Sequence, residues 1–279
     1  VWRGLYPAAA GMITQQRRHD AVSNNIANLN TPGYKEQQAV IRSFPEMLIH
    51  LVGESSGTPG RPANRQIGVV NSGVMVEEIV PNFTQGTLQE TGNPYDVALV
   101  SNIPVDEATG YEPQAFFTVW NEANEPRYTR NGSFYVDAEG GLRTSDGYRV
   151  IGADGQPIVL NVPLEQVRIA ANGALFDANT GEQLAGNPAL LISRIDNPYN
   201  LVREGYGVFR LADPAANPPA AADPAQFSVQ QGFVEQSNVD PARAIVDLMT
   251  ALRIYEANQR VIQYYDSSLD KAVNEVGRV

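Results

Sequence analysis

The C-terminal stretch PARAIVDLMTALRIYEANQRVIQYYDSSLDKAVNEV, residues 241–276, decides the class of fold. Large side chains recur in it at heptad spacing, which places a narrow apolar seam along one side of a helix and is typical of a coiled coil. The two heptad series are Ile245, Leu252, Gln259, Asp266 and Val273, and Leu248, Tyr255, Ile262, Leu269 and Val276. Asp240 suits an N-cap and Pro241 the first helical position. We expect a helix from there to the chain end, roughly 50 Å long at 1.5 Å per residue.

The N-terminal residues carry a matching pattern. Its two series are Leu5, Met12, His19 and Ile26, and Ala8, Gln15, Val22 and Leu29. We expect a helix from about Ala8 to Asn28, because Pro32 cannot continue a helix and Gly33 permits a reversal of the chain. A helix with only a narrow seam needs a partner. The two terminal helices are therefore predicted to pair with each other and with copies in neighbouring subunits, as in a polymer.

The residues between the helices follow a period of two. From about Ile67 to Val234, short runs rich in β-branched and aromatic residues alternate with turns rich in Asp and Gly, such as Asp137–Gly141 and Asp177–Gly181. The segment Phe44–Val52 is ambiguous between helix and strand. Frequent turns between short strands favour an antiparallel sandwich or barrel. The fold class expected is α+β, with long N- and C-terminal helices forming a coiled-coil-like pair around a central all-β domain.

The same patterns divide the chain into four parts. Residues 1–35 form an N-terminal helical assembly arm, and residues 36–66 an extension that ends in a flexible Gly/Pro/Ser-rich loop from about residue 53. Residues 67–236 form the central β-domain, and residues 237–279 the C-terminal helical assembly arm.

Composition excludes several classes of function. The 279 residues carry a net charge of −11, which argues against nucleic acid and anionic membranes as partners. There is no cysteine and there are only two histidines, His19 and His50, so thiolate catalysis and zinc–thiolate sites are excluded and no nucleophile–base pair stands out. We therefore expect no enzyme activity, catalytic residue, metal or cofactor. No apolar run is long enough to span a membrane, and residues 1–10 suggest mature protein rather than a cleaved signal.

Three asparagines, Asn24, Asn25 and Asn28, lie near the end of the first predicted helix. Asparagine is a poor residue inside a helix, because its amide competes for backbone groups. Capping and turn formation account for Asn28. Asn24 and Asn25 are better explained by side-chain amides that bond across a helix interface.

Blocks of sequence along nearly the whole chain carry a resemblance to a known family. They are Asn24–Asn28, Thr31–Lys35, Gln85–Leu88, Thr91–Pro94, Tyr128–Phe134, Asp146–Tyr148, Gly232–Val239, Ala257–Gln259 and Asn274–Arg278. In this order the blocks resemble the axial proteins of the bacterial flagellum, the rod and hook proteins. The length and the opening Arg3–Tyr6 resemble the distal rod group most.

The resemblance implies a structural, non-enzymatic subunit of the basal-body rod that polymerises through its terminal helices and transmits torque. It implies other axial proteins and the flagellar export apparatus as partners, and no nucleic acid or direct membrane insertion. The location implied is the basal body in the cell envelope outside the inner membrane, reached without a cleaved signal. The assembly interface expected from the seams and the blocks comprises Leu5, Met12, Val22, Asn24, Asn25, Ile26, Asn28, Asn238, Leu248, Leu252, Tyr255, Asn258, Ile262, Leu269 and Val276.

Three alternatives stay open at this point. Within the family, the chain is also compatible with a proximal rod or hook-type axial protein. Outside it, a β-sandwich adhesin would not need the two helical seams. A polysaccharide-cleaving enzyme would place a pair of carboxylates in a cleft of the β-domain.

Overall fold

The computed structural model describes residues 4–53, 63–71, 73–105, 110–184, 186, 188–205, 207–215 and 218–276. The chain divides into two compact units, each assembled from segments that are far apart in sequence. Unit 1 comprises Val1–Ile26, Gln37–Val80 and Pro241–Val279, and unit 2 comprises Ala27–Glu36 and Pro81–Asp240. Both chain ends therefore belong to the same unit.

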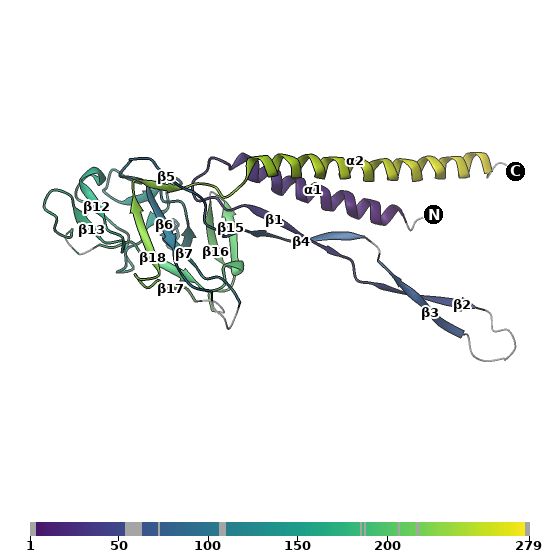
Figure 1. Ribbon diagram of the computed structural model, residues 1–279, viewed down its shortest axis with the longest axis horizontal. Helices are drawn as coiled ribbons and strands as arrows, with labels where there is room; N and C mark the ends of the chain where they lie inside the picture. The colour runs from purple at the N-terminus through teal and green to yellow at the C-terminus, as the bar shows by residue number, and fades with distance from the viewer. Residues whose placement is uncertain are drawn as a thin grey trace. The chain divides into compact units, whose positions relative to one another are not determined.

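Unit 1 contains both long helices and four strands (Figure 1). Its elements are α1 (Leu5–Ala27), β1 (Gln37–Ser43), β2 (Met47–Gly53), β3 (Ala63–Val70), β4 (Val74–Pro81) and α2 (Pro241–Lys271), which ends in the π-helical turn Ala272–Val276. β1 pairs with β4, and β2 pairs antiparallel with β3 from Met47↔Val70 to Gly53↔Ala63. A register shift between Ile49 and His50 interrupts this second ladder.

Apart from two short 3-10 turns, the regular elements described in unit 2 are strands. They are β5 (Leu88–Glu90), β6 (Val97–Ser101), β7 (Gln114–Trp120), β8 (Pro126–Thr129), β9 (Phe134–Val136), β10 (Leu142–Thr144), β11 (Arg149–Val150), β12 (Val167–Ile169), β13 (Leu175–Asp177), β14 (Ile192–Ile195), β15 (Leu201–Gly205), β16 (Val208–Leu211), β17 (Ala220–Ala221), β18 (Phe227–Gln231) and β19 (Phe233–Glu235). The largest sheet follows the order β15-β16-β8-β7-β11-β10-β9, with β14 pairing both β7 and β17. Three further ladders pair β12 with β13, β18 with β6, and β19 with β5. Two short 3-10 turns, Leu164–Gln166 and Pro198–Asn200, complete the unit.

Strand β7 lies at the centre of the core of unit 2. Its residues from Gln114 to Val119 are all buried, so both faces of the strand are covered. Because successive side chains of a strand point to opposite faces, Phe117 enters the larger apolar cluster, with Leu99 and Leu175, while Phe116 enters a second one with Phe83 and Phe209. A continuous apolar run such as Phe116–Trp120 is the sequence pattern of a strand buried on both sides.

The expected fold class is confirmed in its main features, an α+β chain with a mostly β central region between an N-terminal and a C-terminal helix. The expectation of a barrel is wrong for the strands that the structure describes. The path of the largest sheet has β15 at one end and β9 at the other, and these two do not pair, so the sheet does not close. Frequent Asp/Gly turns keep many strands to two or three residues, and four of these short strands, β5, β12, β13 and β19, lie in small ladders outside the largest sheet.

Local expectations had mixed outcomes. Most of the ambiguous segment Phe44–Val52 lies in the strand β2, which begins at Met47, and the extension expected at residues 36–66 contains β1, β2 and the start of β3. The flexible loop was expected at residues 53–66. That expectation is wrong for its two ends, because Gly53 is the last residue of β2 and residues 63–66 belong to β3, and residues 54–62 lie outside the described residues. The C-terminal helix begins at Pro241 as expected, and the N-terminal helix runs from Leu5 to Ala27 instead of Ala8 to Asn28.

Candidate assembly interface

The two helices of unit 1 contact each other in antiparallel orientation. Contacts join Gly4 to Tyr265 and Gly11 to Asn258, and an ion pair joins Arg18 Nη2 to Asp247 Oδ1 at 2.7 Å. Residue numbers rise along one helix as they fall along the other. A Cβ atom added to Gly11 would lie 2.8 Å from Asn258 Nδ2, and one added to Gly4 would lie 2.0 Å from the Tyr265 hydroxyl oxygen. Glycine at positions 4 and 11 therefore leaves room for the side chains of Tyr265 and Asn258 of α2.

The less exposed side chains of α2 recur every seven residues, as predicted. One of the two predicted heptad series is confirmed, and the other is shifted by one residue. The series Leu248, Tyr255, Ile262 and Leu269 is half-buried, as expected of a seam. The accompanying series is Ala244, Ala251, Asn258 and Tyr265, each buried or half-buried, one residue before the expected Ile245, Leu252, Gln259 and Asp266. Ile245 and Leu252 are 51% and 42% exposed. The side chain of Val276 is outside the described set.

Helix α1 is covered on two sides within unit 1. One side carries Gly4, Ala8, Gly11 and Gln15, of which Gly4 and Gly11 contact α2. The other side contacts the strands, where Thr14 Oγ1 donates to the carbonyl oxygen of Val74 at 3.0 Å. Among the expected interface residues, Val22 and Asn25 are buried, Leu5, Met12 and Ile26 are half-buried, and Asn24 is exposed.

Asn25 and Asn238 bond to backbone groups, and Asn28 bonds to a threonine hydroxyl. Asn25 Nδ2 donates to the Gln37 carbonyl oxygen at 2.9 Å, and the Gln37 amide donates back to Asn25 Oδ1 at 2.8 Å, so this side chain replaces a strand partner for β1. In unit 2, Asn28 Oδ1 accepts from Thr31 Oγ1, and Asn238 Oδ1 accepts from the Glu36 amide at 2.7 Å while its Nδ2 donates to the Asn82 carbonyl oxygen. These amides stabilise irregular backbone next to the helices.

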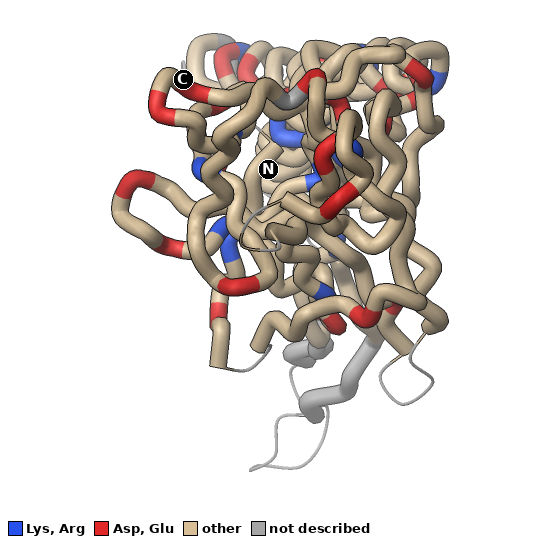
Figure 2. The backbone as a smooth tube through the Cα atoms, turned by 90° about the vertical axis from the view of Figure 1, so that its left-hand side faces the viewer, with Lys and Arg blue, Asp and Glu red and all other residues tan. Residues whose placement is uncertain are grey.

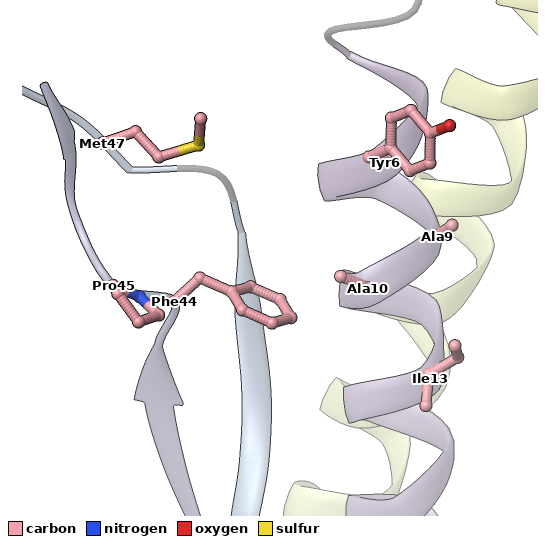
Figure 3. A pocket seen from close by; sticks show the side chains of 7 residues that line it. All are labelled: Tyr6, Ala9, Ala10, Ile13, Phe44, Pro45 and Met47. Atoms are coloured by element: carbon pink, nitrogen blue, oxygen red, sulfur yellow. The ribbon is translucent and has the colours of Figure 1, made fainter. Parts of the chain in front are cut away.

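Unit 1 also carries an apolar groove between α1 and the strands (Figure 3). The groove has a volume of about 610 Å³. It is lined by Tyr6, Ala9, Ala10, Ile13, Phe44, Pro45 and Met47. Tyr6, Ile13 and Met47 each expose more than half of their surface. Apolar side chains that gather on a protein surface are a common feature of interaction sites.

The exposed apolar side chains are distributed unequally between the two units. Among the described residues, only six large exposed ones lie in unit 2, namely Val105, Tyr111, Tyr135, Val159, Tyr199 and Val202. All others belong to unit 1, including Val246, Met249, Val261 and Tyr264 on α2. Apolar surface that the subunit leaves in water is thus concentrated on the two helices and the strands packed against α1.

Charge is divided the opposite way. Unit 1 contains 11 Lys and Arg against 10 Asp and Glu, a net charge of +1. Unit 2 contains 9 against 21, a net charge of −12. Figure 2 marks the acidic residues along the backbone in red and the basic ones in blue. A nearly neutral, apolar unit suits close packing between copies, whereas an acidic surface repels other copies and favours solvation.

A buried cluster of three charged side chains lies inside unit 2. Lys35 Nζ lies 2.6 Å from Glu235 Oε1, and Arg130 Nε lies 3.3 Å from Glu235 Oε2. The three side chains are at most 1% exposed. Arg130 Nη1 also donates to Ser101 Oγ and to the Ala115 carbonyl oxygen, and Lys35 Nζ donates to the Thr84 carbonyl oxygen at 2.8 Å. No sequence pattern marks these three residues individually, although each lies in one of the blocks that carry the resemblance.

The pKa values in and beside the cluster follow from burial. Desolvation lowers the pKa of Lys35 to about 8, with the charge of Arg130 acting in the same direction and Glu235 opposing both. Desolvation also lowers the pKa of Arg130, again against Glu235. The pKa of Tyr34 is raised, because the effect of burial exceeds the opposing effect of Arg203. The guanidinium carbon of Arg203 lies 4.5 Å from the centre of the Tyr34 ring.

No competing chemical site is evident in the described ranges. No group of three or more His, Asp or Glu side chains there could hold a metal ion. The segment Asp177–Gly181 forms a turn that its own hydrogen bonds stabilise. Asp177 Oδ1 accepts from the Asn179 amide, and the Gly181 amide donates to the Asp177 carbonyl oxygen. Within the same ranges, neither helix has the length and apolar character needed to cross a membrane.

The contact at Gly11 can be tested by enlarging the residue. Replacing Gly11 with leucine places a side chain where Asn258 lies, and we expect a loss of about 1–3 kcal/mol in the α1–α2 contact, although leucine favours helix more than glycine does. Amide hydrogen exchange of α1 in the purified protein should become faster. Gln16→Leu on the exposed side of α1 is the matched control, and equal exchange rates in the two variants would contradict the contact.

Comparison with known proteins gives a consistent result along the chain. Residues 5–35 match the family described as flagella basal body rod protein, residues 112–176 the flagellar hook protein FlgE/F/G D1 domain, and residues 230–275 the flagellar basal body rod FlgEFG protein C-terminal. The chain is 38% identical to the flagellar hook-basal body complex protein FlhO of Bacillus subtilis, over 99% of both chains. It is 33% identical to the flagellar basal-body rod protein FlgG of Agrobacterium fabrum over 95% of both chains, and 31% identical to that of Borreliella burgdorferi over 98% of both. The chain therefore belongs to the flagellar basal-body rod protein family, and it is a structural axial subunit rather than an enzyme.

Proposed function

We propose that the protein polymerises through its terminal helices into the rod of the flagellar basal body, outside the inner membrane, and transmits torque along the flagellar axis. The arms at residues 1–35 and 237–279 pair as a short coiled coil in each subunit and pack against the arms of neighbouring copies. The partners are further copies and other axial proteins of rod or hook type. Neither nucleic acid nor direct insertion into a membrane is part of this function.

The observation that carries the proposal is the concentration of exposed apolar side chains on unit 1. A stiff polymer needs a large buried contact in every subunit, and each large apolar side chain that becomes buried contributes about 1.5–3 kcal/mol. α2 carries such side chains around its circumference, with Leu248 and Ile262 half-buried and Val246, Met249 and Val261 exposed. A helix of this kind requires more neighbours than α1 alone provides.

The assembly surface follows from the same argument. It comprises the expected residues of both helices and the adjoining asparagines, of which Leu252 is exposed in the single subunit and available to a neighbour. The β-rich residues 67–236 would then form the outer part of the rod, with the acidic surface in water. Passage through the flagellar export apparatus is part of the same proposal, and a chain without cysteine cannot be cross-linked by disulfides on the way.

The experiment compares one substitution on each unit. Met249 on α2 and Val159 in unit 2 are 50% and 58% exposed, so replacing either with glutamate should leave the isolated subunit folded. Glutamate is compatible with a helix, but burial of its unpaired charge in an interface would cost several kcal/mol. We expect Met249→Glu to abolish incorporation into basal bodies and swimming, and Val159→Glu to have little effect. Normal swimming with Met249→Glu would overturn the proposal.

A further inference from the structure

Two segments that adjoin the helices meet inside unit 2. The segment Gly33–Glu36 follows α1 and the segment Glu235–Asn238 precedes α2, about 200 residues later. The Gly33 amide donates to the Glu235 carbonyl oxygen at 2.7 Å, and the Glu36 amide donates to Asn238 Oδ1 at 2.7 Å. The two segments therefore lie side by side.

Other strand-flanking segments close around this contact. The Asn82 amide donates to the Glu36 carbonyl oxygen at 2.7 Å. A Cβ atom on Gly86 would lie 2.0 Å from the Gln236 carbonyl oxygen, and one on Gly33 would lie 2.5 Å from the Arg130 carbonyl carbon. The backbone of four distant parts of the chain is thus in van der Waals contact around one point.

Glu235 lies at that point and joins all four parts through one carboxylate. Its Oε1 accepts from Lys35 Nζ at 2.6 Å and from the Gly86 amide at 2.9 Å, and its Oε2 faces Arg130 Nε at 3.3 Å. Lys35 belongs to the segment after α1, Glu235 to the segment before α2, and Arg130 follows β8. Side chains of the three residues are buried almost completely.

We propose that the Lys35–Glu235–Arg130 cluster is a clamp that holds the segment leaving α1 and the segment entering α2 together, so that each subunit presents its two helices from one fixed point for assembly. This inference rests on the proposed function in its last step only. The hold on the two segments is a property of the single subunit.

An ionic cluster suits this task better than an apolar contact. Desolvation makes a buried ion pair a weak source of net stability, but a shifted or separated arrangement leaves an unpaired charge in the interior, which is strongly unfavourable. An apolar contact, by contrast, tolerates sliding. Two cations around one carboxylate therefore favour a single alignment of the two segments over neighbouring ones.

The test uses Lys35→Met, which removes one cation and both of its hydrogen bonds and leaves Arg130 and Glu235 paired. Circular dichroism of the purified protein should report a folded unit 2. We expect hydrogen exchange at the Gly33 and Glu36 amides to become about tenfold faster, because a hydrogen bond to a buried charged group is lost beside them. Incorporation into basal bodies in cells should fall at least about tenfold for the same loss of alignment.

The matched control is Glu204→Gln in the same unit, which neutralises the carboxylate that pairs with Arg127 and Arg210 near the surface and should change neither readout. If Lys35→Met does not fold, Lys35→Gln replaces it, since glutamine retains a hydrogen-bond donor without the charge. Unchanged exchange at Gly33 and Glu36 in a folded variant would overturn the clamp, whatever happens in the rod. Faster exchange with normal incorporation would overturn its role in assembly. A failure of the proposed function would be detected by a separate result, namely normal incorporation of the Met249→Glu variant into basal bodies.

Discussion

Replacing Gly132 with alanine is expected to destabilise unit 2 by about 3 kcal/mol or more. A Cβ atom at Gly132 would lie 1.7 Å from the Val97 carbonyl oxygen and 3.2 Å from Phe117 Cε2. The Val97 oxygen belongs to the backbone and cannot turn away as a side chain could. The Val97 amide also donates to the Gly132 carbonyl oxygen at 3.0 Å, which holds the two backbones together.

The surroundings give the structure little room to adjust. Val97, Ala98 and Leu99 of β6 are fully buried, and β6 pairs along its whole length with β18. A shift of β6 away from Gly132 would therefore disturb that ladder and the larger apolar cluster, to which Val97, Leu99 and Phe117 belong. Chemical denaturation of the purified variant would measure the loss.

Gly147→Ala is the control for the conformational part of the effect. Gly147 has φ +86°, which alanine adopts only with strain, but no atom lies within 4 Å of the position that the alanine methyl group would take. We expect a cost of about 1–2 kcal/mol there. A loss at Gly132 no larger than that at Gly147 would show that β6 can move and that the close approach is not decisive.

The helices were predictable from sequence because their periodicity is long. Over three heptads, the recurrence of Leu248, Tyr255, Ile262 and Leu269 exceeds what chance spacing produces, and the Asp-Pro start gives a local signal of its own. The second series was harder to identify. Ala244, Ala251, Gly4 and Gly11 are small, so a search for large apolar residues passes over them, although small size is what allows side chains of the opposite helix to fit.

The strands β1 to β4 were only partly predictable. Phe44–Val52 is a short apolar run, which periodicity alone cannot assign, and β1 and β3 contain mixed residues such as QQAVIRS in Gln37–Ser43. Part of their pairing depends on a tertiary contact, because Asn25 of α1 supplies hydrogen bonds to Gln37. Sequence patterns that consider one segment at a time do not contain such a contact.

The buried cluster was beyond prediction for a related reason. Charged residues are usually exposed, and nothing near Lys35 or Glu235 in sequence marks them as buried. Their environment comes from segments as far apart as Lys35, Gly86, Arg130 and Glu235. The available signal was indirect, since the blocks that carry the family resemblance contain all four residues, but a resemblance by itself does not indicate that the blocks meet.

Raising the pH from 8 to about 10.5 is expected to stabilise unit 2 through Lys35, against the usual loss of stability in alkaline solution. Burial and the neighbouring Arg130 lower the pKa of Lys35 to about 8 in the folded protein, whereas the unfolded chain has an ordinary lysine pKa of 10.5. Between these values the unfolded chain binds a proton that the folded chain has released, so the free energy of unfolding rises with pH in this window. Below pH 8 both states bind the proton, and the folded protein bears the full cost of a buried charge.

The expected change follows from the size of the shift, since one pKa unit corresponds to about 1.4 kcal/mol and the total is therefore on the order of 3 kcal/mol. Urea denaturation at pH values from 7.5 to 10.5 would measure this contribution of Lys35. The measured quantity is the difference in unfolding free energy between the protein and Lys35→Met, in which the effects of tyrosines and other groups that titrate in both proteins cancel. Lys271→Met, which removes an exposed lysine at the end of α2, should follow the unsubstituted protein throughout. A difference between the protein and Lys35→Met that stays constant from pH 7.5 to 10.5 would mean that Glu235 keeps Lys35 charged. Lys35 and Arg130 would then both stay charged beside the single carboxylate of Glu235, and the cluster would keep a net positive charge in the folded interior at alkaline pH.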